Sequence, residues 1–404
     1  MPGRPRKSKG ASSETARHIN RSLILSAIRT SQPVSRADLA RQLGLQRSTV
    51  SLIVEQLMKE RWVLEGGLAQ LPRGRKPRLL ALDVEKAAIV GVNVMPHRTT
   101  IVVADLNSRF LSQESFPTPK EPDGLVSALA ERIERLRKEQ PGTAFEEIGV
   151  SMAGRVDRRT QRVVFAPNLG WCYVDLKGPL EQATGLPVSV ENAANACALA
   201  EVWSGPFAGE QDLVAVTVSE GIGTGIVANG QLVRGPNGAA GEFGHFCLDP
   251  NGPRCNCGSR GCWETYASNT AAVRAYNERI QSDSASPARE GKDHGKSFIR
   301  DFSDLLAFAE RGDVEAAEVL DRMGWYLGLG LAMLVNGLAP SVVTIVGEVT
   351  RAWNRVGAIV QNVVQERVRT HAETQIVPID DILQPRLRGT IALVLQKHFQ
   401  PLAS

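Results

Sequence analysis

Two short runs, AIVGVNV at residues 88–94 and TIVVAD at residues 100–105, decide the fold class of most of the chain. Both are rich in β-branched residues and are separated by a polar turn, so each predicts a buried β-strand. Further strands are expected at residues 148–154, 188–191, 213–218 and 342–347, and helices at residues 125–139, 193–203 and 314–336. Strands alternating with helices predict an α/β domain. Its length of about 320 residues favours two lobes with a ligand cleft between them.

Three helical patterns precede this domain, at residues 19–30, 36–43 and 46–60. Ser35 and Asp38 have the spacing of a capping box at the start of the second helix, and Gly44 ends it. The third helix begins with basic and short polar side chains. Two short helices joined by such a turn are typical of a helix-turn-helix, whose second helix enters the major groove of DNA. A three-helix bundle without DNA-binding activity would show the same apolar stripes.

A basic loop follows the third helix. Residues 62–65 and 78–82 predict paired strands around residues 66–77, a loop that resembles the wing of a winged helix and suits a phosphate backbone or minor groove. The loop could also serve as a hinge to the next domain. The predicted DNA contacts are Arg36, Arg47, Ser48, Thr49, Ser51, Arg73, Arg75 and Lys76.

The charge of the chain is divided unequally. Residues 1–82 hold 16 Lys and Arg against 5 Asp and Glu, a net charge of +11, whereas the remainder carries −7. Such asymmetry indicates a nucleic-acid or membrane-surface contact by the basic part. The first residues form no signal peptide, so we expect a disordered basic arm over residues 1–18 and a cytoplasmic protein. No stretch approaches the ~20 apolar residues of a membrane span.

Three cysteines lie close together in residues 255–262, and a histidine precedes them at position 245. One imidazole and three thiols are the ligand set of a closed tetrahedral zinc site, and four protein ligands leave no open position for a reactive water. The sequence therefore predicts structural Zn²⁺ rather than a disulfide framework. The alternative is a group of free, buried cysteines near a chance histidine. The predicted ligands are His245, Cys255, Cys257 and Cys262, with Gly258 and Gly261 in the tight bends between them.

Six motifs in a fixed order resemble those of the ROK family (repressors, open reading frames and kinases), specifically its regulators with an N-terminal winged helix. They are GVSMAGRVD at 149–157, PNLGW at 167–171, ENAAN at 191–195, GIGTG at 221–225, GAAGEFGH at 238–245 and CNCGSRGCWE at 255–264. The resemblance implies a winged helix-turn-helix followed by a two-lobed actin/hexokinase-like (ribonuclease H-like) module. It also implies the same four metal ligands, and sugar contacts at Asn168, Asn192, Glu242, His245 and Glu264.

The sequence differs from the family's kinases at the positions of the catalytic base and of the nucleotide-binding loops. The resemblance places the catalytic base at position 193, where this chain has alanine, and a methyl group cannot accept a proton. Loss of a general base costs about 10²–10⁴-fold in rate. Pro96 also stands in the first phosphate loop, where it offers no N–H. Glu220 and Glu348 replace small residues near the expected phosphate and adenosine. We therefore predict that no residue is catalytic and that the chain is not an enzyme.

Sugar binding is a separate question, because it needs hydrogen-bonding groups but no base. Carboxylates and amides suit vicinal hydroxyls, since each can pair with two donors. Alternatively, Glu242 and Glu264 only support the metal loop. Ala193 also removes a sugar contact of the family, so affinity for sugar could have been lost altogether.

The resulting prediction is a DNA-binding regulator that represses carbohydrate genes and responds to a sugar in the cleft. A homodimer or higher homo-oligomer is expected, because one helix-turn-helix contacts few base pairs. The alternatives are a regulator controlled by a protein partner or by assembly, with a vestigial sugar site, and a sugar kinase with a DNA-binding appendage. The expected domains are the winged helix at 19–82, a first lobe at 83–200, to which residues 385–404 return, and a second lobe with the metal loop at 201–384.

Overall fold

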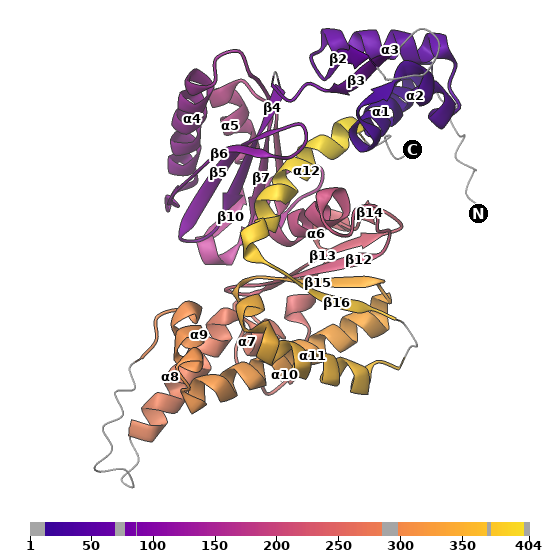
Figure 1. Ribbon diagram of the computed structural model, residues 1–404. Helices are drawn as coiled ribbons and strands as arrows, with labels where there is room; N and C mark the ends of the chain where they lie inside the picture. The colour runs from indigo at the N-terminus through magenta and orange to yellow at the C-terminus, as the bar shows by residue number, and fades with distance from the viewer. Residues whose placement is uncertain (1–12, 69–76, 86, 285–297, 370–372, 400–404) are drawn as a thin grey trace, which may run out of the picture.

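The computed structural model describes residues 13–68, 77–85, 87–284, 298–369 and 373–399 (Figure 1). An N-terminal group of helices lies at one end, and two β-sheets follow it, one beyond the other. We call them the first sheet (order β11-β7-β4-β5-β6) and the second sheet (order β14-β13-β12-β15-β16).

The N-terminal module combines three helices with a three-stranded antiparallel sheet. Ser35 caps the second helix by accepting a hydrogen bond from the Asp38 backbone N–H, and Gly44, at φ 65°, ends it. Ile24, Leu39 and Leu57 are fully buried in its core. This is a winged helix-turn-helix. Its elements are α1 (Ser13–Ser31), β1 (Val34–Ser35), α2 (Arg36–Leu43), α3 (Arg47–Lys59), β2 (Val63–Leu68) and β3 (Arg78–Leu82).

Helix α1 corrects the expected disordered arm, because it begins at Ser13 and not at residue 19. Residues 14–18 contain no helix breaker, and the next turns are held by α3: Arg17 donates to Gln56 Oε1 at 2.8 Å, and Arg21 pairs with Glu60 at 2.6 Å. Tertiary contacts of this kind cannot be seen in local sequence. Residues 1–12 lie outside the described part of the chain.

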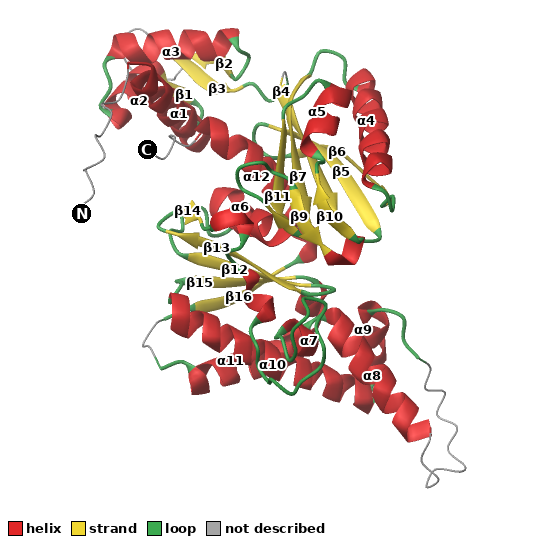
Figure 2. Cartoon of the chain, turned by 180° about the vertical axis from the view of Figure 1, so that it is seen from behind, coloured by secondary structure: helices red, strands yellow, loops and turns green. Residues whose placement is uncertain are grey.

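The first sheet mixes antiparallel and parallel pairing. Strands β4, β5 and β6 form an antiparallel meander, β7 pairs in parallel with β4, and β11 pairs in parallel with β7. Helices α4 (Pro122–Glu139) and α5 (Lys177–Thr184) lie on its outer side (Figure 2). The strands are β4 (Ala87–Val94), β5 (Arg98–Asp105), β6 (Phe110–Pro117), β7 (Ala144–Met152) and β11 (Val188–Asn192), with a small separate sheet of β8 (Arg155–Val156), β9 (Val163–Ala166) and β10 (Trp171–Val174).

The second sheet is covered by helices on the side away from the first sheet (Figure 2). Its strands are β12 (Leu213–Val218), β13 (Ile222–Ala228), β14 (Gln231–Leu232), β15 (Val342–Val346) and β16 (Gln375–Ile379). The covering helices are α7 (Glu264–Ala267), α8 (Asn269–Ser284), α9 (Phe302–Glu310), α10 (Val314–Leu338) and α11 (Trp353–Arg367).

Two helices, α6 (Ala193–Ser204) and α12 (Pro385–Phe399), lie between the sheets, and α12 reaches the winged helix (Figure 1). Their close approach requires glycine: a Cβ on Gly389 would lie 2.0 Å from the Ala196 carbonyl oxygen, and one on Gly149 would lie 2.2 Å from that of Thr390. The expected two-lobed α/β architecture behind an N-terminal winged helix is confirmed.

Candidate ligand cleft, metal centre and DNA-binding face

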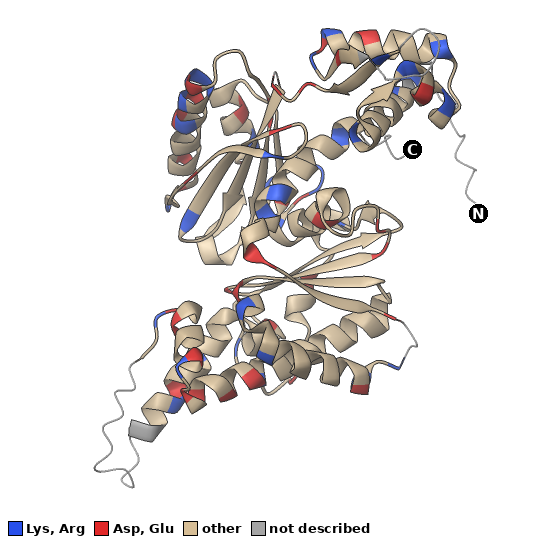
Figure 3. Cartoon of the chain, viewed as in Figure 1, with Lys and Arg blue, Asp and Glu red and all other residues tan. Residues whose placement is uncertain are grey.

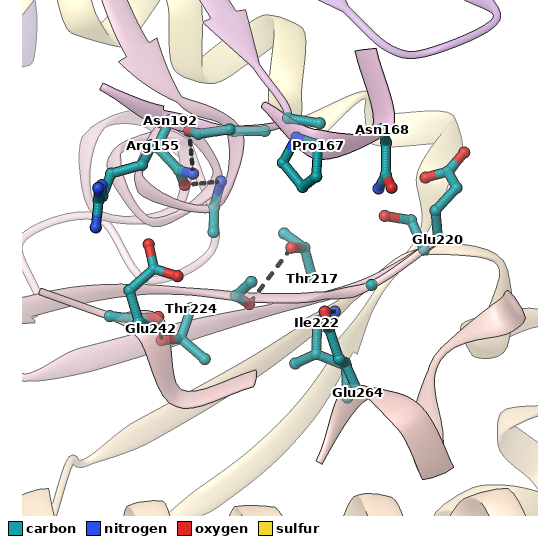
Figure 4. A pocket seen from close by; sticks show the side chains of 18 of the residues that line it. Arg155, Pro167, Asn168, Asn192, Thr217, Glu220, Ile222, Thr224, Glu242 and Glu264 are labelled. Carbon is teal, nitrogen blue, oxygen red and sulfur yellow. Dashed lines mark hydrogen bonds between the residues drawn. The ribbon is translucent and has the colours of Figure 1, made fainter. Parts of the chain in front are cut away.

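A cavity of about 190 Å³ opens between the two lobes. Met95, Ala153, Asn192 and Ser219 line it, each at or just beyond the carboxyl end of β4, β7, β11 or β12. Ligands of α/β proteins commonly bind at this edge of a sheet. The cavity brings together all five predicted sugar contacts, which are Asn168, Asn192, Glu242, His245 and Glu264 (Figure 4 shows four of them).

Asn192 joins the cleft to α6. Its Oδ1 accepts hydrogen bonds from the backbone N–H groups of Ala194 at 2.8 Å and Asn195 at 3.3 Å, and so caps the helix. Its Nδ2 donates to the Gly154 carbonyl at 2.8 Å. Ala193, the next residue, is 7% exposed and lines the cavity, so a methyl group occupies the cleft at the start of α6.

Glu191 ties the two lobes together beside the cavity. This buried carboxylate, at the end of β11, pairs with the Nε of Arg234 at 2.7 Å and accepts from Asn195 Nδ2 at 2.9 Å. Arg234 follows β14 in the second sheet. The ion pair therefore crosses between the lobes and fixes the β11–α6 corner on which Asn192 sits. This pair could not be expected from the sequence, because its partners lie 43 residues apart in the chain.

The acidic side chains of the cleft surround His245. Glu242 Oε2 lies 3.6 Å from His245 Nε2, and Glu264 Oε1 lies 3.4 Å from Nδ1. The other oxygen of Glu264 accepts from the Ile222 backbone N–H at 3.4 Å. Burial raises the pKa of Glu242, and His245 and Arg155 lower it by less. Two carboxylates and an imidazole thus meet at one wall of the cavity, as hydroxyl recognition requires.

The predicted metal ligands converge. One ligand atom from each of His245, Cys255, Cys257 and Cys262 lies within 4.8 Å of the others. The Cys257 and Cys262 sulfurs are 3.7 Å apart, close to the ~3.8 Å that two thiolates bound to one tetrahedral zinc would show. Burial raises the pKa of the Cys255 and Cys262 thiols. A cation would supply the charge that stabilises their thiolates, so this group could hold a metal ion.

The expected glycine bends are present in the metal loop. Gly258 and Gly261 have φ values of 93° and 62°, and a Cβ on Gly261 would lie 1.6 Å from the Asp249 carbonyl oxygen. Side chains with a Cβ are strained in this conformation. The loop can therefore bring Cys255, Cys257 and Cys262 together only with glycine at these positions.

Two carboxylates occupy the positions that the family resemblance assigns to the phosphate and adenosine of a kinase. Glu220 lines the cavity just beyond β12. Glu348, just beyond β15, is held in place because its oxygens accept from Asn269 Nδ2 at 3.0 Å and Ser303 Oγ at 2.9 Å. A fixed negative charge repels phosphate, so both positions disfavour ATP.

The predicted DNA-binding residues divide into three groups. Arg47, Ser48, Thr49 and Ser51 lie together at the N-terminal end of α3, where Arg47 and Ser48 are exposed. Leu52, 58% exposed, extends this face and was not expected. Arg36 is instead engaged within the module, with Glu65 at 3.1 Å and Glu55 at 3.4 Å. Arg73, Arg75 and Lys76 lie outside the described residues.

Comparison with known proteins relates the chain to one family and to several of its members. The sequence pattern of the ROK family matches residues 89–397. The xylose repressor of Bacillus subtilis (strain 168) is 33% identical over 328 residues, which are 80% of this chain and 81% of that protein.

Among solved structures, a ROK family transcriptional regulator, described as a homologue of the E. coli MLC protein, superposes with a TM-score of 0.82 and 25% identity, over 95% of this chain and 98% of its own. A ROK family glucokinase from Streptomyces griseus, in complex with glucose and AMPPNP, matches with a TM-score of 0.65 and 30% identity, over 76% of this chain and 98% of its own. The similarity to the regulator therefore extends further along this chain than the similarity to the glucokinase.

Proposed function

Because the chain belongs to the ROK family, we propose that it is a sugar-responsive, DNA-binding repressor of carbohydrate genes and not a sugar kinase. One observation carries the proposal: α6 begins in the cleft between the lobes and ends against the winged helix. A single helix thus connects a cavity lined by hydroxyl-binding side chains to a DNA-binding module.

The winged helix supplies the DNA contacts in this proposal. The exposed start of α3, with Arg47 and Ser48, enters the major groove, and the basic loop before β3 contacts phosphates. Arg36 supports α3 through its ion pair with Glu55. Among the helices in the described part of the chain, none is both long and apolar enough to cross a membrane. The proposed partners are operator DNA and a second copy of the chain, in the cytoplasm.

Asn168, Asn192, Glu242, His245 and Glu264 are the proposed sugar contacts. The repressor relatives that are named for xylose support a monosaccharide effector. The cleft offers amide and carboxylate groups from both lobes, so a sugar bound there favours one arrangement of the lobes over another. Such differential binding is what an effector needs in order to shift an equilibrium.

The proposed absence of kinase activity is supported by three side chains at the expected base and nucleotide positions. Ala193 places a methyl group where the kinases of the family have their base, and Glu220 and Glu348 place negative charge where phosphate and nucleotide would bind. Each change alone lowers phosphoryl transfer, and together they affect both the base and the nucleotide.

The proposed coupling runs along α6. Its 12 residues span about 18 Å, from Asn192 in the cleft to Trp203 at the winged helix. The Arg29 guanidinium of α1 lies 4.0 Å from the Trp203 ring centroid and donates to the Trp203 carbonyl at 3.2 Å. Phe399 of α12 packs edge-on against both Trp203 and Trp62. A shift of α6 on effector binding therefore changes the surface on which the winged helix rests.

Zn²⁺ is the proposed occupant of the four-ligand group, with a structural role. His245 can serve both sites, because its Nδ1 lies 3.6 Å from the Cys255 sulfur and its Nε2 lies toward Glu242. The bound ion would hold the loop that carries Glu264 and orient His245 for the sugar.

The test measures binding of the purified full-length protein to DNA from its own promoter region, with and without a panel of pentoses, hexoses and amino sugars. Fluorescence anisotropy should show DNA binding that one sugar changes by about 5- to 150-fold, the usual range of allosteric coupling. A parallel assay should show no ADP formation from ATP with any of these sugars. Sugar-dependent ADP formation would contradict the proposal. If the protein binds DNA, but no sugar changes that binding and no sugar binds the protein directly, control by a protein partner is favoured.

A further inference from the structure

Arg155 is a cation in the cleft that the proposed function does not use. It begins β8, in the first lobe, and its side chain lines the cavity (Figure 4). Its Nε is buried and has no hydrogen-bond partner. Within the described residues, no carboxylate oxygen lies within 4.0 Å of its guanidinium, whereas Glu242 and Glu264 of the same cavity each lie within 3.6 Å of His245. A partly buried arginine without a counter-charge is costly, unless a ligand supplies the charge.

The surroundings of Arg155 favour an anion. Ala193 contributes a methyl group to the cavity, so no carboxylate side chain is present at the start of α6. The N-terminal turn of α6, with Ala193, Ala194 and Asn195, faces the same space, and a helix N-terminus carries partial positive charge. Asn192 caps this turn with a neutral amide oxygen, so the positive potential is not cancelled by a charge.

The acidic groups of the cleft offset the charge of Arg155 only in part. Glu242, across the cleft in the second lobe, is close enough for Arg155 to lower its pKa, but the two form no ion pair. Glu220 and Glu264 lie on the other side of the cavity from Arg155 (Figure 4). The cavity thus contains several hydroxyl acceptors and one cation that, within the described residues, has no ion-pair partner within 4.0 Å.

We propose that the effector is a monosaccharide bearing an anionic group, a carboxylate or a phosphate, and that Arg155 binds this group. This inference rests on the proposed sugar-responsive function and narrows its ligand. Arginine matches the two oxygens of a carboxylate or phosphate with two parallel N–H donors. In this arrangement Arg155 binds the anion from the first lobe, while Glu264 and His245 bind ring hydroxyls from the second. An anionic sugar would therefore hold the two lobes together more strongly than a neutral sugar of the same ring.

The test compares sugars that differ only at C6. Calorimetric titration of the full-length protein uses glucose, glucuronate and glucose 6-phosphate, and galactose with galacturonate and galactose 6-phosphate. We expect at least one anionic member to bind roughly 10- to 100-fold more tightly than its neutral parent, the range for a hydrogen bond to a charged group. Comparing the uronate with the phosphate identifies which anion the site takes. Binding of the preferred anion should weaken with added salt, and binding of the parent should not.

Variants of Arg155 assign the effect to this side chain. Arg155→Gln should remove the preference, so that the anionic sugar and its neutral parent bind with similar affinity, whereas Arg155→Lys should keep part of the preference. Arg158→Gln, in the exposed turn after β8, is the matched control and should leave the preference for the anion unchanged.

Three results would overturn the inference. Neutral sugars that bind as tightly as the anionic ones would refute it and leave the proposed function intact. A preference for the anion that survives in Arg155→Gln would refute the role of this residue. No binding by any of the six sugars, while promoter DNA still binds, would overturn the inference together with the sugar-responsive part of the proposed function. The wild-type comparison and its salt dependence need no variant, so they hold even if Arg155→Gln fails to fold.

Discussion

Cys257 contributes one of four ligand atoms to the metal group, and its replacement tests the structural role of the ion. Cys257→Ser leaves three good ligands, and structural zinc sites supply about 10–16 kcal/mol of folding free energy in small zinc-binding peptides. We expect loss of bound zinc and a lower midpoint of thermal unfolding. Metal analysis and calorimetry would measure both.

Cys172→Ser is the matched control for this prediction, because Cys172 is an exposed cysteine on β10, outside the metal group. It should retain both zinc and stability. A Cys257→Ser variant that lacks metal but unfolds at the wild-type temperature would show that the ion has no structural role.

Ala193 allows a second test at the level of a single residue. Ala193→Asp places a carboxylate at the start of α6, but Glu220 and Glu348 still put negative charge at the expected phosphate and adenosine positions. We therefore expect no ADP formation from ATP above the wild-type level with any sugar of the panel. Measurable turnover in Ala193→Asp would mean that the nucleotide site is functional and that only the base is missing.

Some of these residues could be predicted from the sequence, and others could not. The metal group could be predicted, because its four ligands lie within residues 245–262, and residues so close in sequence are also close in space. Arg155 lies inside a glycine motif, where no local pattern marks it as a ligand contact. Its meaning depends on Glu242 and Ala193, which long-range folding brings to the same cavity. The cross-lobe pair of Glu191 with Arg234 was missed for the same reason.

At the level of elements, α6 is the proposed link between effector and DNA. Trp203→Leu should remove the stacking of Arg29 on the indole ring while leaving the cleft and α3 untouched. Such cation–π contacts contribute about 0.5–2 kcal/mol, comparable with a typical coupling free energy of 1–3 kcal/mol. We expect the affinity for the effector and the affinity for DNA to change by less than about threefold each. The change in DNA affinity that the effector causes should be almost lost.

A matched control for this prediction is Arg132→Gln. Arg132 of α4 also lies 4.0 Å from an aromatic ring, that of Phe116, on the outer side of the first sheet. Arg132→Gln removes a cation–π contact without touching α6, so the effect of the effector on DNA binding should persist. Equal loss of coupling in both variants would show that general destabilisation, and not the α6 route, is responsible.

Elements with strong local patterns were predicted well. Helices α3, α6 and α10 begin and end within two residues of their expected bounds, because caps and apolar stripes mark them. The small strands β8 and β10 gave no such signal, since two to four residues are too few for a period to show. The position of α12 between the sheets depends on glycines such as Gly149, whose role is visible only once Thr390 packs against it.

Across the whole molecule, basic charge is concentrated at the DNA-binding end. Residues 1–82 carry a net +11, and within the described part of that module Arg47 has no carboxylate within 4.0 Å. Other basic residues are neutralised locally. Lys and Arg also gather on α4, but there they alternate with Asp and Glu (Figure 3), and Arg135 pairs with Glu114 and Glu139. Attraction to DNA should therefore depend on where a charge lies and not on the total.

This distinction gives a prediction for the salt dependence of DNA binding. Removal of one phosphate-binding side chain reduces the slope of log K against log salt concentration by about 0.9. Arg47→Ala and Arg75→Ala should each weaken DNA binding. Arg75→Ala, in the proposed phosphate-binding loop, should also flatten the slope by about 0.9 if one copy contacts the site, or about twice that if a two-fold dimer does. Arg135→Ala removes the same charge from α4 and should leave both affinity and slope unchanged. If all three variants flatten the slope equally, overall charge attracts the DNA and the winged helix is not its binding face.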